Sequence, residues 1–241
     1  MRKLVIIPTY NERENVEAML STVLSLAGDF SVLVVDDGSP DGTAEIVKQV
    51  KTASPERVFL LERAGKLGLG TAYIAGFRWA LERGYDAVFE MDCDFSHDPN
   101  DLLRMAVTLE EGEADVVVGS RYVKGVNVVD WPMRRLLLSY CASRYVRCVT
   151  RMPVRDATAG FVGYRAEVLQ TINLDEVRMK GYGFQIEMKY TAWRLGFRIK
   201  ELSIIFRDRT AGTSKMSGSI FGEAFWGVMG LRLRRIKKSK Q

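Results

Sequence analysis

Short apolar runs alternate with amphipathic stretches along the first half of the chain. The runs are rich in Val, Ile and Leu, and several show no polar alternation, which is typical of strands buried on both faces of a sheet. We expect strands at Leu4–Ile7, Val32–Val35, Val58–Leu61, Ala87–Met91 and Val116–Val118. We expect helices between them, at Glu14–Leu26, Thr43–Lys51, Thr71–Arg83 and Pro99–Leu109. This alternation predicts an α/β fold with a mostly parallel central sheet flanked by helices.

The pattern changes after Arg121. Beyond it, we expect helices over residues 131–149, 185–194 and 219–236, and strands over residues 161–164 and 198–206. No internal repeat, low-complexity tract or linker interrupts the chain. One domain with a substrate-binding second half is therefore the simplest interpretation.

Positive charge is concentrated at one end of the chain. The 241 residues include 35 Lys and Arg and 30 Asp and Glu, which gives a formal charge of +5. Residues 232–240 contain six basic residues and no acid, so the rest of the protein is close to neutral. The tail suggests an acidic partner. Because the basic residues do not interleave with aromatic ones, we expect no nucleic-acid partner.

The cysteines and the histidine exclude several kinds of chemistry. Cys93, Cys141 and Cys148 form neither a disulfide framework nor a CxxC pair, which favours a reducing compartment. With His97 as its one histidine, the sequence excludes histidine-triad and multi-histidine metal chemistry. The apolar run at 4–7 is too short for a signal peptide, and no apolar run is long enough to predict a transmembrane helix. We therefore expect a cytoplasmic protein.

Two of the predicted strands end in acidic residues. Asp36 and Asp37 follow one strand, and Asp92 and Asp94 follow another. Side chains alternate in an extended segment, so Asp92 and Asp94 point to one side. Parallel sheets bind their ligands beyond the carboxyl ends of the strands. Two carboxylates there suit Mg²⁺ or Mn²⁺, which bind through one or two carboxylates plus substrate phosphates.

Other acids and glycines have simpler interpretations. Asp41 and Asp98 precede predicted helices, and we interpret both as helix caps. The glycine-rich stretch at 65–70 has the spacing G-x-x-G-x-G and follows a later strand, so it does not match the dinucleotide-binding fingerprint. The P-loop motif is missing from the sequence.

Seven segments, which run in order from residue 4 to about residue 215, together match one known group of proteins. They are PTYNE (8–12), VVDDGSPDGT (34–43), LGLGTAYIAG (67–76), MDCDFSHDP (91–99), GSRY (119–122), KGYGFQIEM (180–188) and DRTAGTSK (208–215). With these segments the chain resembles the dolichol-phosphate mannose synthases, which are inverting family-2 glycosyltransferases with the GT-A fold. A single segment indicates only a family-2 transferase, and the combination narrows the resemblance to polyprenyl-phosphate glycosyl synthases.

The resemblance implies roles for particular residues. It implies a nucleotide-sugar site formed by Pro8, Tyr10, Glu12, Val35, Asp37, Asp92, Cys93, Asp94, Arg209 and Lys215. It implies that Asp92 and Asp94 hold Mg²⁺ or Mn²⁺. It implies that Arg121 and Arg135 bind the acceptor phosphate, and that these two arginines act in catalysis together with Asp94. Some relatives have Gln at the position of Ser96, so we do not expect Ser96 to be a metal ligand.

The implied reaction transfers mannose from GDP-mannose to dolichyl phosphate or another polyprenyl phosphate, with inversion to a β-linked product. A family-2 transferase with another donor, such as UDP-glucose, is the main alternative. A non-catalytic subunit is disfavoured by the intact DxD segment and by Arg121. The acceptor phosphate has a second pKa of about 6, so it is largely a dianion near neutral pH and needs no general base. We therefore interpret His97 as a structural residue of the DxD loop rather than as a base.

The domain organisation and location follow from these interpretations. We expect a GT-A domain over residues 1–218, with a nucleotide-sugar half at 1–121 and an acceptor half at 122–218. Residues 219–241 are expected to form an amphipathic helix with a basic tail. We expect a peripheral protein at the cytoplasmic face of a membrane, with or without a small membrane-anchoring subunit.

Three groups of side chains each have two interpretations. The aromatic residues Phe221, Phe225 and Trp226 either pack on the core or lie at a lipid interface, and a lipid-linked acceptor favours the interface. Arg134 and Arg135 form either a solvated face or, at Arg135, a phosphate clamp. Tyr182 and Phe184 are either core aromatics or part of a mobile acceptor loop.

Overall fold

The computed structural model describes residues 1–208, 219–234, 236, 238 and 239, and for residues 219–224 it describes the backbone alone. The strands are β1 (Lys3–Thr9), β2 (Phe30–Asp36), β3 (Val58–Glu62), β4 (Ala87–Glu90), β5 (Val116–Ser120), β6 (Val128–Val129), β7 (Val162–Arg165), β8 (Ile199–Ser203) and β9 (Phe206–Arg207). The helices are α1 (Val16–Ser25), α2 (Thr43–Ala53), α3 (Leu69–Glu82), α4 (Asp101–Glu110), α5 (Met133–Thr150), α6 (Ala166–Thr171), the 3-10 helix η1 (Leu174–Glu176), α7 (Tyr182–Arg194) and α8 (Ser219–Leu233).

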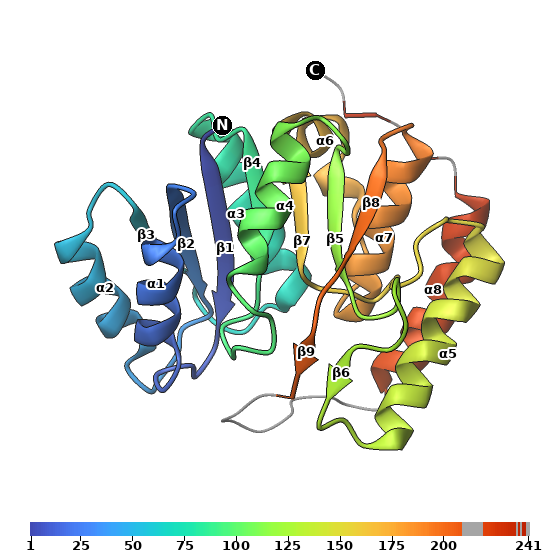
Figure 1. Cartoon of the computed structure of the whole chain (residues 1–241), viewed down its shortest axis with the longest axis horizontal. Helices are drawn as coiled ribbons and strands as arrows, with labels where there is room; N and C mark the ends of the chain where they lie inside the picture. The colour runs from blue at the N-terminus through green and yellow to red at the C-terminus, as the bar shows by residue number, and fades with distance from the viewer. Residues whose placement is uncertain (209–218, 235, 237, 240–241) are drawn as a thin grey trace.

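The central sheet has seven strands in the order β3-β2-β1-β4-β7-β5-β8 (Figure 1). Strands β3, β2, β1 and β4 are parallel neighbours, and β5 is parallel to β8. Strand β7 runs antiparallel between β4 and β5. The parallel strands therefore end at one edge of the sheet, and β7 begins at that same edge. The prediction of an α/β fold with a mostly parallel sheet is confirmed.

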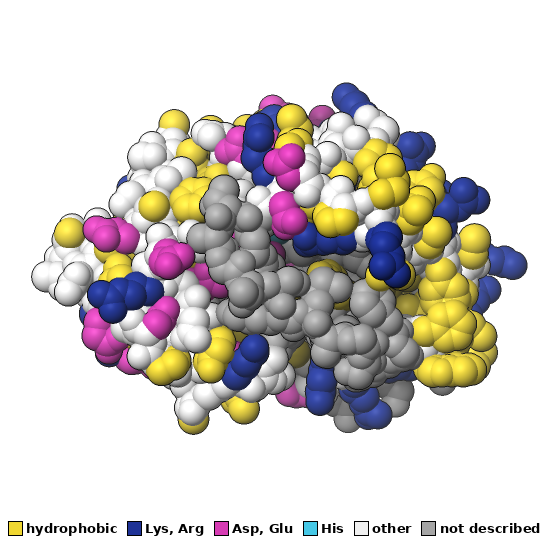
Figure 2. Space-filling view, turned by 90° about the horizontal axis from the view of Figure 1, so that it is seen from below, with side chains coloured by type: hydrophobic (Ala, Val, Ile, Leu, Met, Phe, Trp, Pro, Cys, Tyr) yellow, Lys and Arg dark blue, Asp and Glu magenta, His cyan; other side chains and the backbone are white. Residues whose placement is uncertain are grey.

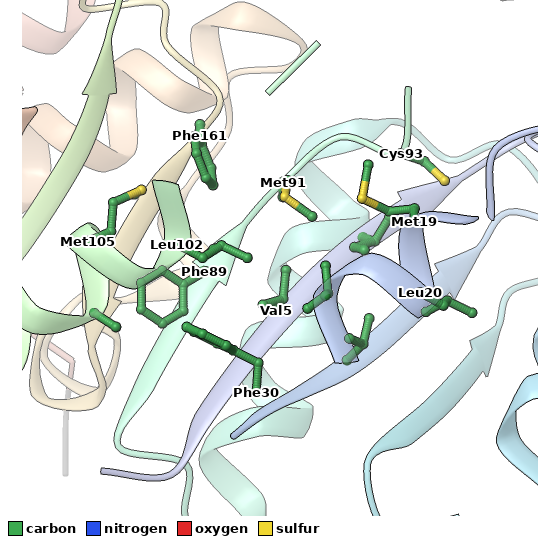
Figure 3. Close-up of a cluster of buried hydrophobic side chains, with 14 of the residues drawn as sticks. Val5, Met19, Leu20, Phe30, Phe89, Met91, Cys93, Leu102, Met105 and Phe161 are labelled. Carbon is green, nitrogen blue, oxygen red and sulfur yellow. The ribbon is translucent and has the colours of Figure 1, made fainter. Parts of the chain in front are cut away.

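Helices cover both faces of the sheet and bury two hydrophobic clusters. Helices α1, α2 and α4 pack on one face, where Phe30 and Phe89 meet edge to face with ring centroids 5.7 Å apart (Figure 3). Helices α3, α6 and α7 pack on the other face, where Tyr73 and Phe184 stack at 5.9 Å. Every strand that is covered on both sides must be apolar on both sides, which explains the continuous runs of Val, Ile and Leu.

Helices α5 and α8 lie side by side at the β8 end of the sheet (Figure 1). Val146 of α5, Tyr190 of α7 and Leu231 of α8 belong to a third buried cluster. Just beyond α8, the guanidinium of Arg234 forms an ion pair with the buried Glu187 of α7. One side of α8 is therefore packed on the rest of the protein.

Some element boundaries differ from the predicted ones. The expected strand over 198–206 forms two strands, because the chain leaves β5 after Ser203 and then pairs with β6 through β9. Helix α7 begins three residues earlier than expected, at Tyr182. Helix α4 begins at Asp101 rather than at Pro99, and Asp98 Oδ1 accepts from Asn100 N at 2.9 Å in the turn before it. Asp41 Oδ1 accepts from Thr43 N at 3.0 Å in the turn before α2, but the N-cap residue of α2 is Gly42, so Asp41 lies one residue before the predicted cap position.

Candidate active site

The ends of three adjacent strands bring the expected nucleotide-sugar residues together. Strand β1 lies between β2 and β4, and Pro8 of β1 is paired in register with Val35 of β2. Tyr10 and Glu12 follow β1, Asp37 follows β2, and the DxD segment follows β4. Sequence positions that are more than 80 residues apart therefore share one edge of the sheet.

The two acids at the end of β2 have different partners. The buried carboxylate of Asp36 accepts hydrogen bonds from Thr9 Oγ1 at 2.8 Å and from Ser39 N at 2.8 Å. Asp37 Oδ1 instead accepts from Arg63 Nε at 2.6 Å, and Arg63 Nη1 donates to Thr71 Oγ1 at 2.8 Å. Asp36 therefore shapes the turn after β2, whereas Asp37 is fixed to the start of α3 through Arg63. No pattern in the sequence marks Arg63 as a partner of Asp37.

The glycine-rich stretch before α3 lies beside this strand edge. Lys66 Nζ is 4.9 Å from the centroid of the Tyr10 ring. Gly68 has a φ of +103°, a conformation that favours glycine. A Cβ at Gly70 would lie 2.8 Å from the ring of Phe184, so a side chain there would disturb the core. Gly68 thus allows the backbone conformation before α3, and Gly70 allows close packing against Phe184.

The DxD segment is anchored in the core by its middle residue. Cys93 is 3% exposed and belongs to the same hydrophobic cluster as Met19 (Figure 3). Burial raises the pKa of the Cys93 thiol well above its usual value, so the thiol stays protonated and is a poor metal ligand. Asp94 is buried and its Oδ1 accepts from Ser96 N at 3.1 Å, while Asp92 is half-buried.

The carboxylates of the DxD segment fit a hard divalent cation. Within the described parts of the chain, no group of three or more His, Cys, Asp or Glu side chains is arranged to hold a metal ion. A cation held by Asp92 and Asp94 would need further ligands, such as substrate oxygens and water. Mg²⁺ and Mn²⁺ bind in this way at phosphate sites.

His97 is packed among aromatic rings close to the DxD segment. Its ring centroid lies 4.9 Å from that of Phe161 and 5.2 Å from that of Phe206. Burial lowers the pKa of His97 to about 4, so the imidazole is neutral near neutral pH. These contacts favour the structural interpretation of His97, because they join the DxD loop to β9 and to the segment before β7.

Arg121, which follows β5, is held by a buried aspartate, Asp156, that no sequence motif marks. Arg121 Nε donates to Asp156 Oδ2 at 2.7 Å, and Nη2 donates to Asp156 Oδ1 at 2.6 Å. Arg121 Nη2 also lies 2.9 Å from Thr158 Oγ1. Asp156 is fully buried and Arg121 is 6% exposed, so the orientation of this guanidinium is fixed. Asp156 lies between predicted elements, where the hydrophobic pattern carries no information.

Arg135 lies in the first turn of α5 and shares an aromatic neighbour with Arg121. Its guanidinium carbon is 4.2 Å from the centroid of the Trp131 ring, and that of Arg121 is 5.3 Å from the same ring. Arg135 Nη1 donates to Asp208 Oδ1 at 2.7 Å. Arg134, by contrast, is exposed to solvent. The structure therefore brings Arg121 and Arg135 together, while Arg209 and Lys215 lie outside the described residues.

An apolar pocket of about 360 Å³ opens between α5 and α8, and both arginines line it. Its lining also includes Trp131, Leu138, Cys141, Tyr145, Val146, Tyr182, Ile186, Phe225 and Val228. Tyr182 thus faces the pocket. Phe184 is fully buried and stacks with Phe77 as well as with Tyr73, so for Phe184 the structure favours a core aromatic over a mobile loop.

Exposed apolar side chains gather on the outer surfaces of α5 and α8. They are Met133, Leu137, Leu138 and Tyr140 of α5, and Phe225, Trp226, Met229 and Leu233 of α8. Figure 2 shows hydrophobic side chains gathered at this end of the molecule, with Lys and Arg side chains beside them. Such a cluster with a basic border is typical of an interaction surface. Throughout the described residues, the structure contains no helix with the length and apolar character needed to cross a membrane.

Comparison with known sequences agrees with this arrangement. Residues 4–172 match glycosyl transferase family 2. The polyprenol monophosphomannose synthase of Mycolicibacterium smegmatis is 47% identical over 98% of this chain and 90% of its own length. The undecaprenyl-phosphate mannosyltransferase of Micrococcus luteus is 46% identical over 97% of this chain and 99% of its own length. The resemblance inferred from the seven segments is confirmed.

Solved structures of glucosyl-3-phosphoglycerate synthase from Mycobacterium tuberculosis have the same fold. A complex with Mn²⁺, UDP and glucosyl-3-phosphoglycerate has a TM-score of 0.67 at 19% identity, and covers 96% of this chain and 78% of its own. A complex with phosphoglyceric acid has a TM-score of 0.70 at 19% identity, with 95% and 79% covered. At this identity the likeness establishes the fold alone, and the predicted GT-A fold is confirmed.

Proposed function

The chain belongs to glycosyl transferase family 2, and from this premise we propose that it transfers mannose from GDP-mannose to a polyprenyl phosphate. One observation carries the proposal: Arg121 and Arg135 line an apolar pocket between α5 and α8. The names of the two relatives supply the sugar and the class of lipid. GDP as the donor nucleotide comes from the resemblance described above.

A polyprenyl phosphate has a dianionic head and an apolar chain, and the pocket offers a partner for each. Arginine binds phosphate bidentately, and the Trp131 ring restrains both guanidinium groups. Val146, Phe225 and Val228 provide apolar wall. Removing isoprenoid surface from water contributes about 25 cal/mol per Å². This combination of charge and apolar wall supports a lipid phosphate rather than a small soluble acceptor.

The donor is placed over the ends of β1, β2 and β4. Tyr10 and Asp37 contact the nucleoside in this proposal, and Asp92 and Asp94 hold Mg²⁺ or Mn²⁺ against the diphosphate. The cation supplies neutralisation of the charge that develops on the diphosphate as the sugar leaves. The roles of Arg209 and Lys215 at the diphosphate stay predictions, because both residues lie outside the described residues.

The reaction is a single displacement at the anomeric carbon. An oxygen of the lipid phosphate attacks C1 of mannose, and the bond between C1 and the β-phosphate oxygen of GDP breaks. GDP leaves with the electron pair of that bond, and the configuration at C1 changes from α to β. Arg121 and Arg135 orient the attacking phosphate. Its second pKa is about 6, so it is already deprotonated near neutral pH, which agrees with a neutral, packed His97.

The apolar surface on α5 and α8 is proposed to rest on the cytoplasmic face of a membrane. This surface lies beside the pocket, and Leu138 and Phe225 belong to both. Arg144 and Arg147 of α5 are exposed and would meet anionic headgroups there. A phosphate held at the bilayer surface would then reach the two acceptor arginines without a membrane-spanning segment of this chain.

The direct test is transfer of labelled mannose by the purified chain to a short polyprenyl phosphate. We expect a β-linked product by NMR, and loss of transfer after removal of divalent cations with a chelator. A panel of GDP-mannose, GDP-glucose and UDP-glucose identifies the donor. Transfer from UDP-glucose but not from GDP-mannose would contradict the proposed donor, whereas transfer by the chain alone would show that no membrane subunit is needed.

Two cysteines of α5 give a binding test that does not depend on turnover. Cys141 and Cys148 are both exposed, but only Cys141 lines the pocket, and Cys93 is buried. We expect a polyprenyl phosphate to slow the modification of Cys141 by a maleimide and to leave the rate at Cys148 unchanged. Equal modification rates at Cys141 with and without the lipid would show that the acceptor does not bind in this pocket.

A further inference from the structure

A buried lysine lies near the acceptor arginine, and the proposed reaction makes no use of it. Lys189 of α7 and Glu90, the last residue of β4, are both fully buried. Burial lowers the pKa of Lys189 to about 8 and raises that of Glu90 to about 8. Fully buried lysines are rare because removing an ammonium from water is costly. An apolar residue would fill position 189 without that cost, so the lysine calls for an explanation.

The contact of Lys189 is with a turn that precedes β7. Lys189 Nζ donates to the carbonyl oxygen of Ala159 at 2.7 Å. Ala159 N in turn donates to the carbonyl oxygen of Asp156 at 3.3 Å, which closes the turn. Gln185, one helical turn before Lys189, approaches the next residue, since a Cβ at Gly160 would lie 4.0 Å from its Nε2. Helix α7 therefore holds the end of this turn through the hydrogen bond of Lys189, with Gln185 beside it.

The same turn carries the partners of Arg121. The Asp156 carboxylate accepts from Nε and Nη2 of Arg121, and its Oδ2 also accepts from the Arg121 backbone N at 2.9 Å. Thr158 Oγ1 adds a further contact to Nη2 at 2.9 Å. The direction of the guanidinium is thus set by where residues 156–159 lie. A displacement of the turn moves the group that is proposed to hold the acceptor phosphate.

The beginning of the turn has a different anchor. Glu201 of β8 accepts from Arg155 N at 2.7 Å and from Asp156 N at 2.9 Å. The turn is therefore held at both ends, by a carboxylate from the sheet and by an ammonium from α7. A glutamate and a lysine on separate elements together fix five residues that have no regular secondary structure of their own.

We propose that Lys189 is a positioning residue for the acceptor phosphate, because its hydrogen bond to Ala159 fixes the turn that orients Arg121. The inference rests on the proposed function, in which Arg121 is an acceptor residue. Burying the ammonium is costly, but it fixes the orientation of Arg121, as expected for a residue that supports a site without contacting the substrate. It also gives α7 a role in acceptor binding beyond Tyr182 and Ile186, which line the pocket directly.

The test is Lys189→Met, which keeps the side-chain length and removes the donor. Lys200→Met is the matched control, because Lys200 is partly exposed and pairs with Glu113 away from the turn. We expect the KM for the polyprenyl phosphate, and the lipid concentration that half-protects Cys141, to rise about tenfold in Lys189→Met. The KM for GDP-mannose should stay within about twofold of the wild-type value, since the donor residues lie on other strand ends.

A second variant covers the case in which Lys189→Met does not fold, because it leaves Glu90 buried alone. Glu90→Gln combined with Lys189→Met replaces both buried ionisable groups, a change that proteins often tolerate. Glu90→Gln alone is its reference. A folded variant whose acceptor constants equal those of its reference overturns the proposal, as does a parallel rise in both KM values. A wild-type chain that shows neither transfer nor protection of Cys141 would instead overturn the proposed function itself.

Discussion

The proposed nucleotide-sugar site and the proposed acceptor site of this protein hold their polar side chains by different means. In the nucleotide-sugar site the supporting contacts join residues that are at most 27 positions apart: Asp36 and Ser39 are three apart, Asp94 and Ser96 are two apart, Asp37 and Arg63 are 26 apart, and Asp36 and Thr9 are 27 apart. In the acceptor site they span longer distances along the chain. Arg121 and Asp156 are 35 residues apart, and Arg135 and Asp208 are 73 apart.

This difference separates two kinds of stability. A carboxylate at the end of a buried strand keeps its place as long as the sheet forms, because the strand itself positions it. An arginine held by a distant aspartate keeps its place only if both segments pack correctly. Variants of the strand-end acids should therefore affect chemistry with little effect on folding, whereas variants of the acceptor-site arginines should affect acceptor binding and folding together.

The largest expected effect is at the DxD segment. Asp94→Ala should lower the rate of transfer by about a thousandfold, because the charge of the leaving diphosphate loses its cation. The free energy of unfolding should change by less than about 1 kcal/mol, since the acid lies at a strand end and not in the apolar core. Labelled-mannose transfer and urea unfolding check the two parts.

Asp98→Ala is the matched control for this variant, because Asp98 is an exposed acid of the same loop. It should transfer mannose at close to the wild-type rate. Near-normal turnover of Asp94→Ala at saturating Mg²⁺ would refute the metal role, and with it the view that the strand-end acids carry the chemistry.

The next effect concerns the acceptor arginines, where neighbouring residues allow a close comparison. Arg135→Gln should raise the KM for the polyprenyl phosphate by about 10- to 100-fold, because a hydrogen bond to a charged group is lost. Arg134→Gln should change it by less than about twofold, since Arg134 is exposed. Calorimetry with GDP should give similar affinities for both variants. A large loss of GDP affinity in Arg135→Gln would move Arg135 to the donor site.

Arg121→Ala is expected to weaken acceptor binding at least as strongly, but it has a second consequence. It leaves Asp156 buried without its main partner, and breaking a buried ion pair from one side costs about 3–5 kcal/mol of stability. Urea unfolding must therefore accompany its kinetics. A variant of unchanged stability would contradict the long-range support described for the acceptor site.

A smaller effect is expected on the pH dependence of stability, through His97, which packs against Phe161 and Phe206. The pKa of His97 is lowered by burial from its ordinary 6.5 to about 4. Between these values the unfolded chain binds a proton that the folded protein does not, so stability should rise as the pH increases from 4 to 6.5. The contribution is at most about 1.4 kcal/mol per pH unit. This contribution to the pH dependence of stability should disappear in His97→Phe.

Urea unfolding of the wild-type chain and His97→Phe at several pH values measures this contribution as a difference, which cancels the titration of the carboxylates. A difference that stays constant between pH 4 and pH 6.5 would mean that His97 titrates as it does in the unfolded chain. The DxD loop would then be less firmly packed against Phe161 and Phe206 than the ring contacts indicate.

The smallest effects are expected at the apolar surface of α5 and α8. Trp226 is 72% exposed, and Trp226→Glu should weaken flotation with anionic vesicles severalfold. Neutralising the basic tail should weaken binding to the vesicles by about 1 kcal/mol per residue. High salt should weaken this binding in a similar way. Val107→Glu on α4, where Val107 is 47% exposed, is the matched control. If Trp226→Glu with a neutral tail floats as well as the wild type, another surface docks the protein.

Much of the first half could be predicted from the sequence because its determinants are local. Continuous apolar runs locate β1, β2, β3, β4 and β5, and the acids that follow β2 and β4 mark the edge of the sheet where the donor is proposed to bind. For the C-terminal helix, the sequence left two interpretations open: packing on the core or contact with lipid. Val228 and Leu231 of α8 are buried while Trp226 is exposed, so the helix packs on the core with one side and presents an apolar surface with the other.

The supports of the acceptor site could not be predicted in the same way. Asp156 follows no hydrophobic period, and its importance comes from Arg121, a partner that only the folded chain brings near. The same holds for Arg63, which supports Asp37 in the proposed nucleotide-sugar site. The pocket likewise needs α5 and α8, whose sequences are far apart and give no sign of pairing. Position 93 illustrates the same point, because the sequence shows a cysteine between two acids and the structure shows an anchor in the core.

The pairing of each acceptor arginine with a carboxylate has a consequence for turnover. Asp156 is fully buried with Arg121, whereas the pair of Arg135 and Asp208 is about one-third exposed and open to exchange. In the proposed reaction, an incoming acceptor phosphate would therefore compete with Asp208 for the guanidinium of Arg135. In the proposed reaction the acceptor is a monoester with two negative charges, and the product is a diester with one. The weaker competitor is thus the product, and Asp208 returning to Arg135 would help to release it.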